Sequence, residues 1–317
     1  MGLAMLGAVS QGILWGVMVL GVFITYKLLD IADLTVDGSF ALGGSVCAVL
    51  VVSGVDPVLA IFAAMLAGMI AGAVTGFLHT VFEIPAILAG ILTQIALWSV
   101  NLRIMGKSNT PLLRVDTLFS SVTDATGLPQ NVASIIVGLI FAILIIVALY
   151  WFFGTEIGSA CRATGNNEAM VRALGVDTKV TKMIALTLSN GLVGLSGGLI
   201  CESQGYADIG MGTGAIVIGL AAIVIGEVLG RLTPGKLRSF GSRLTAAVVG
   251  SVVYFLIRAI VLQLGMDAND MKLISAVIVA LALCIPVVWE KYQLRRAYAR
   301  SAKAAPATPA ANSERGR

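Results

Sequence analysis

The chain has 317 residues, of which 58% are hydrophobic and 12% are charged, and its formal net charge is +4. Soluble domains are about a quarter charged, so this composition excludes an ordinary soluble enzyme and predicts an integral membrane protein. The apolar segments are too long and too evenly apolar for barrel strands, whose side chains alternate, so we expect spanning helices.

Apolar segments follow one another along most of the chain, and roughly 20 residues are needed to cross a bilayer. They predict an all-α, polytopic transmembrane helical bundle of about nine membrane segments. Residues 27–50 form either one simple crossing or a broken or re-entrant helix. We expect residues 1–294 to form the membrane domain, and 295–317, rich in Ala, Pro, Ser and Arg, to form a disordered basic tail. The predicted segments are 4–26, 39–54, 57–81, 84–102, 132–153, 183–201, 213–230, 244–264 and 272–289.

Charged residues are distributed unevenly between the loops. The polar stretch 154–182, the segment 231–243 and the tail from Lys291 are basic, and the positive-inside rule places all three in the cytoplasm. The loops 202–212 and 265–271 carry acids and no Lys or Arg, so they face outward. Counting crossings back from 154–182 puts the amino terminus outside, whereas the carboxyl terminus is cytoplasmic.

Residues 27–40 place several acids beside the start of the second segment. Acids at membrane depth usually line a cavity or a pathway, and broken helix ends in transporters commonly meet polar substrate groups. We therefore assign Asp33, Asp37 and Ser39 to a translocation path. The alternative, an interfacial loop with capping aspartates, has about equal weight.

The eighth segment carries a cation within an apolar run. Tyr254 and Arg258 lie at i and i+4 and therefore on one face of a helix. We assign both to the path, because an intramembrane Arg is expected to have a functional role or a buried partner. Arg258 would then bind a substrate carboxylate or pair with Glu202 or Asp208, or its side chain would reach the outer surface.

Small residues recur at four-residue spacing in several apolar segments, and this spacing lets helices approach closely in membranes. Each repeat is weak evidence alone, but together they predict that the third, sixth and seventh segments are central and tightly packed. The glycines assigned to helix packing are Gly68, Gly72, Gly76, Gly194, Gly197 and Gly198.

Several kinds of chemistry are not expected. The four cysteines are far apart without CxxC spacing, and the single histidine, His79, ends an apolar helix, so we expect no metal centre and no cofactor. A phosphate-binding loop of the G-x4-G-K-[ST] type is missing, so ATP hydrolysis of that type would occur on another protein. We predict no catalytic residues and no nucleic-acid partner.

The longest strongly polar run is 154–182. Within it, Asn166 or Asn167 can cap a short helix, and Glu168 stands in the first turn, where the helix dipole favours an acid. Gly175 would end this helix. Its apolar face suits docking into a groove on a soluble partner, and lying on lipid headgroups is an equally good alternative. The apolar residues are Ala169, Met170, Ala173 and Leu174, and Arg172 is charged.

The chain resembles the permeases of ABC importers in the branched-chain amino acid and ribose group. The resemblance is carried by GNNEAMVRALGVD at 165–177, SNGLVGLSGGL at 189–199, DLTVDGSF at 33–40, and QGYADIGMGTGAIVIGLAAIVIGE at 204–227. The last two stretches resemble a subgroup whose relatives are proposed to carry aromatic amino acids. The likeness covers nearly the whole chain except the last 20 or so residues, which are of low complexity.

This resemblance implies a membrane-spanning subunit of an ATP-driven importer that carries a small polar solute, an amino acid in particular. Its partners would be a cytoplasmic ABC ATPase, a periplasmic or lipid-anchored substrate-binding protein, and a second permease copy, with a homodimer as the simplest arrangement. The location would be the cell inner membrane. ATPase coupling would fall on Asn166, Asn167, Glu168, Ala169, Arg172, Leu174 and Gly175.

Two other classes of function fit the sequence less well. A stand-alone secondary transporter or channel should place coupling-ion acids in the middle of helices, but nearly all acids here stand at helix ends. A membrane-embedded enzyme would need paired catalytic groups at bilayer depth, and the sequence has no such pair.

Overall fold

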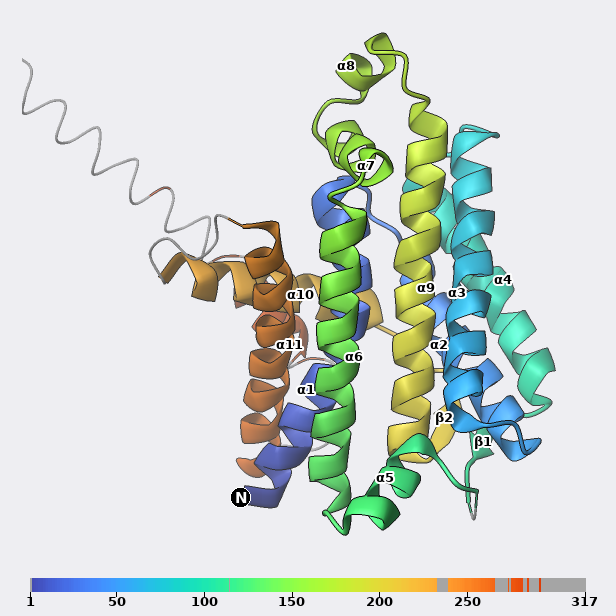
Figure 1. Ribbon diagram of the computed structural model, residues 1–317, viewed down its shortest axis with the longest axis vertical. Coiled ribbons are helices and arrows are strands. Elements are labelled where there is room, and N and C mark those ends of the chain that lie inside the picture. Colours follow the sequence, from blue (N-terminus) through green and yellow to red (C-terminus); the bar gives the residue numbers. More distant parts are fainter. Residues whose placement is uncertain are drawn as a thin grey trace, which may run out of the picture.

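The computed structural model describes residues 2–113, 115–232 and 239–265, together with 273, 275–281, 284 and 291 (Figure 1). The predicted tail, 295–317, and half of the predicted segment 272–289 lie outside these residues. The described chain is an elongated helical bundle. Its helices are α1 (Gly2–Phe23), continued by a π-helical turn η1 (Ile24–Leu28), α2 (Thr35–Val52), α3 (Pro57–Thr80), α4 (Ala86–Met105), α5 (Leu118–Thr126), α6 (Gln130–Phe152), α7 (Glu156–Asn166), α8 (Glu168–Ala173), α9 (Thr178–Gln204), α10 (Ala215–Leu232) and α11 (Phe240–Gln263).

Seven helices of the described chain are long and apolar enough to cross a membrane. They are α1 with η1, α2, α3, α4, α6, α9 and α11. The helical bundle is therefore confirmed, but the expected count of about nine is not reached within the described residues. The predicted segment 213–230 forms α10, a shorter apolar helix that runs across the bundle in Figure 1.

One small feature departs from the all-α prediction. Strands β1 (Asn109–Pro111) and β2 (Tyr206–Asp208) pair antiparallel, with Asn109 opposite Asp208. Both strands belong to loops that lie at the end of the bundle with α5 and the amino terminus (Figure 1). The ribbon is only three residues long on each side, which is too short for an alternating pattern to reveal it in the sequence.

Helix boundaries follow local signals in the chain. Asp56 accepts hydrogen bonds from the N–H groups of Val58 and Leu59, and Pro57 takes the first helical position of α3. At the end of α9, Gly205 adopts a left-handed conformation with φ of 76°, which costs glycine little. The predicted start of the third segment at residue 57 is confirmed by this cap.

Helices α1, α2 and α9 form the interior of the bundle. Between 72% and 83% of their most apolar windows is buried, against 28% to 39% for α3, α4, α6 and α11. Large apolar side chains such as Leu66, Ile70 and Ile143 are exposed on the outer helices. These outer surfaces are of the kind that faces lipid in a membrane.

Glycines allow α9 to approach α2 and α3 at backbone distance. A Cβ on Gly72 would overlap the Leu186 carbonyl oxygen, and one on Gly197 would overlap that of Phe40. Gly68 and Gly194 have equally little space, each facing backbone of the opposite helix. The Cβ would lie 3.3 Å from Met183 Cα at Gly76 and 3.1 Å from Ala64 Cβ at Gly198, so these two positions are tight without overlapping backbone.

Replacing Gly72 with Ala should destabilise the folded chain, because the added methyl group must push α3 away from α9. Overpacking of this kind typically costs about 1–3 kcal/mol, so the thermal midpoint in detergent, followed by size-exclusion chromatography, should fall. Gly7→Ala is the control: its Cβ would have no neighbour within 4 Å, and Ala favours the helix. Equal midpoints for the two variants would contradict the close-packing argument.

Candidate functional site

The polar stretch 154–182 forms two short helices at one end of the bundle, opposite the amino terminus (Figure 1). The first, α7, was not expected from the sequence. Its signals were present, because Thr155 can cap it and buried residues recur at three-residue spacing: Gly158, Cys161 and Thr164. Thr164 and Thr181 join their hydroxyl groups at 3.0 Å, which fixes α7 against α9.

The second helix, α8, has the predicted boundaries to within a residue. Of the two candidate caps, Asn167 is the one used: its Oδ1 atom accepts the Met170 N–H at 3.0 Å. Asn166 is instead the last residue of α7. Leu174 closes α8, and Gly175 follows with φ of 85°, in the left-handed region that favours glycine.

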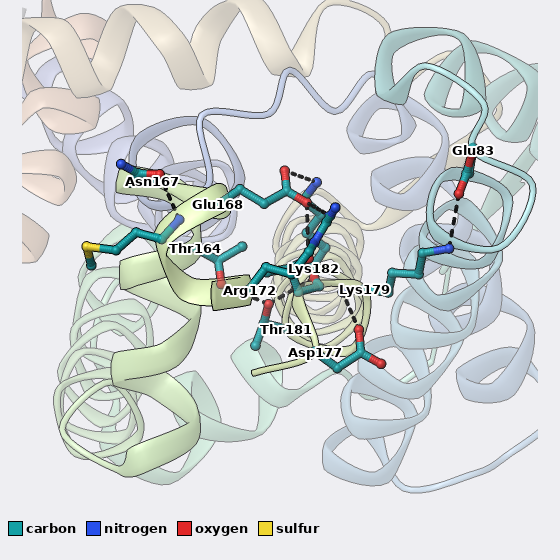
Figure 2. Close-up of polar contacts among 11 residues, drawn as sticks. Glu83, Thr164, Asn167, Glu168, Arg172, Asp177, Lys179, Thr181 and Lys182 are labelled. Carbon is teal, nitrogen blue, oxygen red and sulfur yellow. Dashed lines mark hydrogen bonds and ion pairs between the residues drawn. The ribbon is translucent and has the colours of Figure 1, made fainter. Parts of the chain in front are cut away.

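Glu168 ties α8 to the first turns of α9, as Figure 2 shows. Its Oε2 atom accepts a hydrogen bond from Lys182 Nζ at 2.7 Å. Its Oε1 atom accepts from Arg172 Nη2 at 2.8 Å and from Thr178 Oγ1 at 3.1 Å. We call these four residues the latch. Its carboxylate is fully engaged within the chain, so the charge of Glu168 is already neutralised there.

Electrostatics keeps the latch closed at neutral pH. The hydrogen bond from Lys182 holds the pKa of Glu168 below its ordinary value of 4.5, with Thr178 and the Arg172 charge adding to the effect. The stability that Glu168 contributes is thus present above its ordinary pKa and is lost only as the pH falls below it. Nearby, burial raises the pKa of the Cys161 thiol to about 11, so this group stays neutral and unreactive.

The apolar side chains of α8 point away from the bundle. Met170 is 53% exposed and Leu174 is 73% exposed, and Ala169 and Ala173 are exposed as well. Only Val171 turns inward, with 2% exposure. Arg172 is exposed as well, and it is paired with Glu168. A surface helix usually buries its apolar residues, so α8 is unusual in exposing most of them.

Two residues assigned to the path, Asp33 and Ser39, belong to a buried hydrogen-bond network centred on Asn190 of α9. Asn190 Nδ2 donates to Asp33 Oδ2 at 2.6 Å, and Ser39 Oγ donates to Asn190 Oδ1 at 2.7 Å. The second Asp33 oxygen accepts the Thr35 N–H at 2.9 Å. Neither Asp33 nor Ser39 lines either of the two large cavities of the bundle. Their assignment to the path stays a prediction.

Asp37 has a different position, at the amino-terminal end of α10. Its Oδ2 atom accepts the Gly214 N–H at 2.9 Å, and its Oδ1 atom accepts the Ile216 N–H at 3.0 Å. Ala215 and Ile216 are buried, so α10 begins inside the bundle. A carboxylate from α2 therefore satisfies backbone donors that α10 leaves unpaired at its start.

Two adjoining cavities open toward the end of the bundle that carries β1, β2 and α5. Their volumes are about 860 and 690 Å³. Their walls come mainly from α1, α9, β2, α10 and α11, and both cavities are lined by Gln11, Gln204, Tyr206 and Arg258. Of these four residues, only Arg258 was predicted from the sequence to line the path. Gln11 was recognisable as a polar residue within the apolar run 4–26.

Arg258 and Tyr254 have different environments although they share a helix face. Arg258 lines both cavities, its guanidinium carbon lies 5.7 Å from the Phe255 ring centre, and it forms no ion pair with a described residue. The alternative pairing with Glu202 is excluded, because Glu202 accepts hydrogen bonds from Leu118 N at 2.8 Å and the Cys47 thiol at 3.4 Å. Tyr254 is buried away from both cavities, and its hydroxyl has no partner among the described residues.

Comparison with known proteins identified one family model, "Branched-chain amino acid transport system / permease component", which matches residues 4–284. A tyrosine transport system permease protein of Clostridioides difficile (strain R20291) is 38% identical over 274 residues, 86% of this chain and 88% of the relative. The ribose import permease protein RbsC of Escherichia coli (strain K12) is 30% identical over 168 residues, 52% of this chain and 50% of the relative. No solved structure matched the chain.

Glu168→Gln should loosen the latch, because the amide loses its charge while keeping the shape of the side chain. Backbone amides in 168–177 should then exchange with deuterium several-fold faster, as measured by mass spectrometry. The matched control is Glu83→Gln, which removes the more exposed pair with Lys179 at 3.2 Å; exposed pairs contribute at most about 1 kcal/mol. Equal exchange in the two variants would show that the latch does not hold α8.

Proposed function

The chain belongs to the family of permease components of branched-chain amino acid transport systems, and we propose that it is the membrane-spanning subunit of an ATP-driven importer for an amino acid. The observation that carries the proposal is the exposed apolar face of α8. Glu168 is paired with Lys182 of α9 and with Arg172 within α8, while Met170 and Leu174 are exposed on the outside. A short helix with an exposed apolar face suits insertion into a groove of a soluble protein.

A separate ATPase subunit is the partner that best fits this surface. In Figure 1, α8 lies at the extreme end of the described molecule, beyond the ends of α3 and α6, whose apolar surfaces are of the lipid-facing kind. A helix lying on headgroups would instead turn basic residues toward the lipid. Here Arg172 and Lys182 are directed to Glu168, which favours docking over lipid contact.

Contacts leading from α7 to the cavities support mechanical coupling. Gly165 of α7 packs against Leu28 of η1 so closely that a Cβ would overlap the Leu28 carbonyl oxygen. Lys27 of η1 is paired with Glu227 of α10 at 2.7 Å. Since η1 continues α1, a movement of α7 would reach both α1 and α10, and both helices form cavity walls. ATP binding would thereby shift the population between outward- and inward-open states.

The cavity chemistry supports an amino acid as the solute. Arg258 offers a guanidinium group without an ion-pair partner among the described residues, which suits a carboxylate. Trp15 and Phe40 pack with ring centres 4.7 Å apart beside the same space. The name of the Clostridioides difficile relative refers to tyrosine, and an aromatic amino acid is the substrate class we propose here.

The assembly we propose follows the family pattern. The α8 end would be cytoplasmic, with the carboxyl terminus on the same side and the amino terminus outside, in the cell inner membrane. A binding protein would deliver the solute to the cavity end, and a second permease copy would complete the pore. Asp33, Asp37 and Ser39 would hold the broken helix start beside the path, and Tyr254 would position the helix that carries Arg258.

Changing both Met170 and Leu174 to Ser should separate the permease from its ATPase. Burying each such side chain contributes about 1.5–3 kcal/mol, so recovery of the ATPase in co-purification should fall at least tenfold. Leu113→Ser is the control, because this residue is 77% exposed and closely follows β1, which lies at the opposite end of the bundle. Undiminished recovery with the double variant would refute docking through α8.

Arg258→Gln should reduce uptake of labelled tyrosine by proteoliposomes containing the whole importer, because the substrate carboxylate loses its charged partner. Co-purification with the ATPase should be unchanged, since Arg258 lies in the cavities, far from α8. Arg103→Gln serves as the control, as Arg103 is exposed and outside both cavities. Normal uptake by the Arg258 variant would remove Arg258 from the path.

A further inference from the structure

We propose that the permease itself recognises both charged ends of an amino acid, with Asp208 binding the ammonium group and Arg258 the carboxylate. The inference rests on the proposed function and adds a specificity-determining residue, Asp208, to it. If it is correct, the membrane subunit selects the solute together with the binding protein.

The charges of the larger cavity are few and complementary. Among its described lining residues, one side chain is cationic, Arg258, and one is anionic, Asp208. They belong to different elements, α11 and β2, and no ion pair joins them. Two opposite charges that share a cavity without neutralising each other leave room for a ligand that carries both signs.

Asp208 is held in place while keeping one oxygen available. Its backbone is fixed by pairing with Asn109 of β1. Its Oδ1 atom accepts the Gly210 N–H at 2.8 Å, which orients the carboxylate. The Oδ2 atom makes no hydrogen bond to a described residue, and the side chain is only half-buried. An ammonium group is a suitable donor for this atom, since charge-assisted bonds are the strongest in this class.

The start of α10 is a competing site for the carboxylate, and it is already occupied. Gly214 lines the cavity, and helix starts attract anions. However, the two carboxylate oxygens of Asp37 already accept hydrogen bonds there from the N–H groups of Gly214 and Ile216. The negative end of a solute is therefore directed to Arg258, and its positive end to Asp208.

The remaining walls suit the body of an amino acid. Trp15 and Phe40 supply an aromatic surface, whereas Gln11, Gln204 and Tyr206 supply polar groups. The volume of about 860 Å³ lies in the range of small-molecule sites. A ligand bound at both ends would thus place its side chain against apolar and aromatic groups.

A purely structural role for Asp208 makes a different prediction. Its bond to Gly210 N could serve only to shape the turn that leads into α10. Asn at position 208 keeps the Oδ1 acceptor and loses the charge, so Asp208→Asn separates the two roles.

The test measures direct binding to the purified permease–ATPase complex in lipid nanodiscs, without the binding protein. The probes are L-phenylalanine, 3-phenylpropionate, which lacks the ammonium group, and phenethylamine, which lacks the carboxylate. Wild type should bind phenylalanine most tightly. Asp208→Asn should weaken phenylalanine and phenethylamine binding about tenfold or more, and leave phenylpropionate binding unchanged. Arg258→Gln should instead weaken the binding of phenylalanine and phenylpropionate and leave phenethylamine binding unchanged.

Asp124→Asn is the control, since Asp124 is an exposed acid of α5 at the same end of the bundle; it should bind all three probes as wild type does. The proposal is overturned if Asp208→Asn weakens all three probes equally, if it weakens none, or if wild type does not distinguish phenylalanine from phenylpropionate. Tyrosine uptake by the whole importer tests the proposed function separately from the binding roles of Asp208 and Arg258. If one of those binding results is found and the importer still takes up tyrosine normally, the proposed function stands. If the permease neither supports uptake nor associates with the ATPase, the proposed function is refuted.

Discussion

Asp37 supplies the hydrogen bonds that allow a helix to begin inside this bundle. Backbone N–H groups at a helix start have no partner within the helix, and in a membrane they cannot turn to water. The two oxygens of Asp37 satisfy those of Gly214 and Ile216. Because α10 begins there, Thr213 and Val217 become cavity wall. The space beside Arg258 therefore depends on a carboxylate that does not itself need to touch the solute.

The two ends of the molecule use charge in opposite ways. In the latch, Glu168 pairs with Arg172 within α8 and with Lys182 of α9, and the second pair fixes α8 to α9. In the larger cavity, Arg258 and Asp208 remain apart. The helix α1 and its turn η1 connect these two regions, since η1 contacts α7 and α1 lines the cavity. One fold thus combines a firmly held helix, α8, at one end with a cavity at the other end whose two opposite charges are not paired with each other.

Features set by local chemistry could be predicted from the sequence. Periodic apolar runs gave most spans, and the Asn167 cap and Gly175 placed α8 correctly. Long-range pairing could not be predicted, because side-chain identity does not say which distant atom completes a hydrogen bond. Asp37 was recognised as an important acid, but its partners are about 180 residues away in sequence. Likewise, the sequence indicated Asp208 only as a possible partner of Arg258, and its position in the cavity wall depends on the pairing of β2 with β1.

The outward face of α8 has a consequence for how a partner would be selected. Its exposed apolar residues are Ala169, Met170, Ala173 and Leu174, and the exposed cation Arg172 is paired with Glu168 of the same helix. Contact through such a face is governed by shape and apolar area, which dissolved ions screen very little, unlike pairs of exposed charges. An interface made mainly of such residues depends only weakly on the ionic strength of the surrounding medium. Matching partners would then be distinguished by the fit of a few side chains rather than by attraction at a distance.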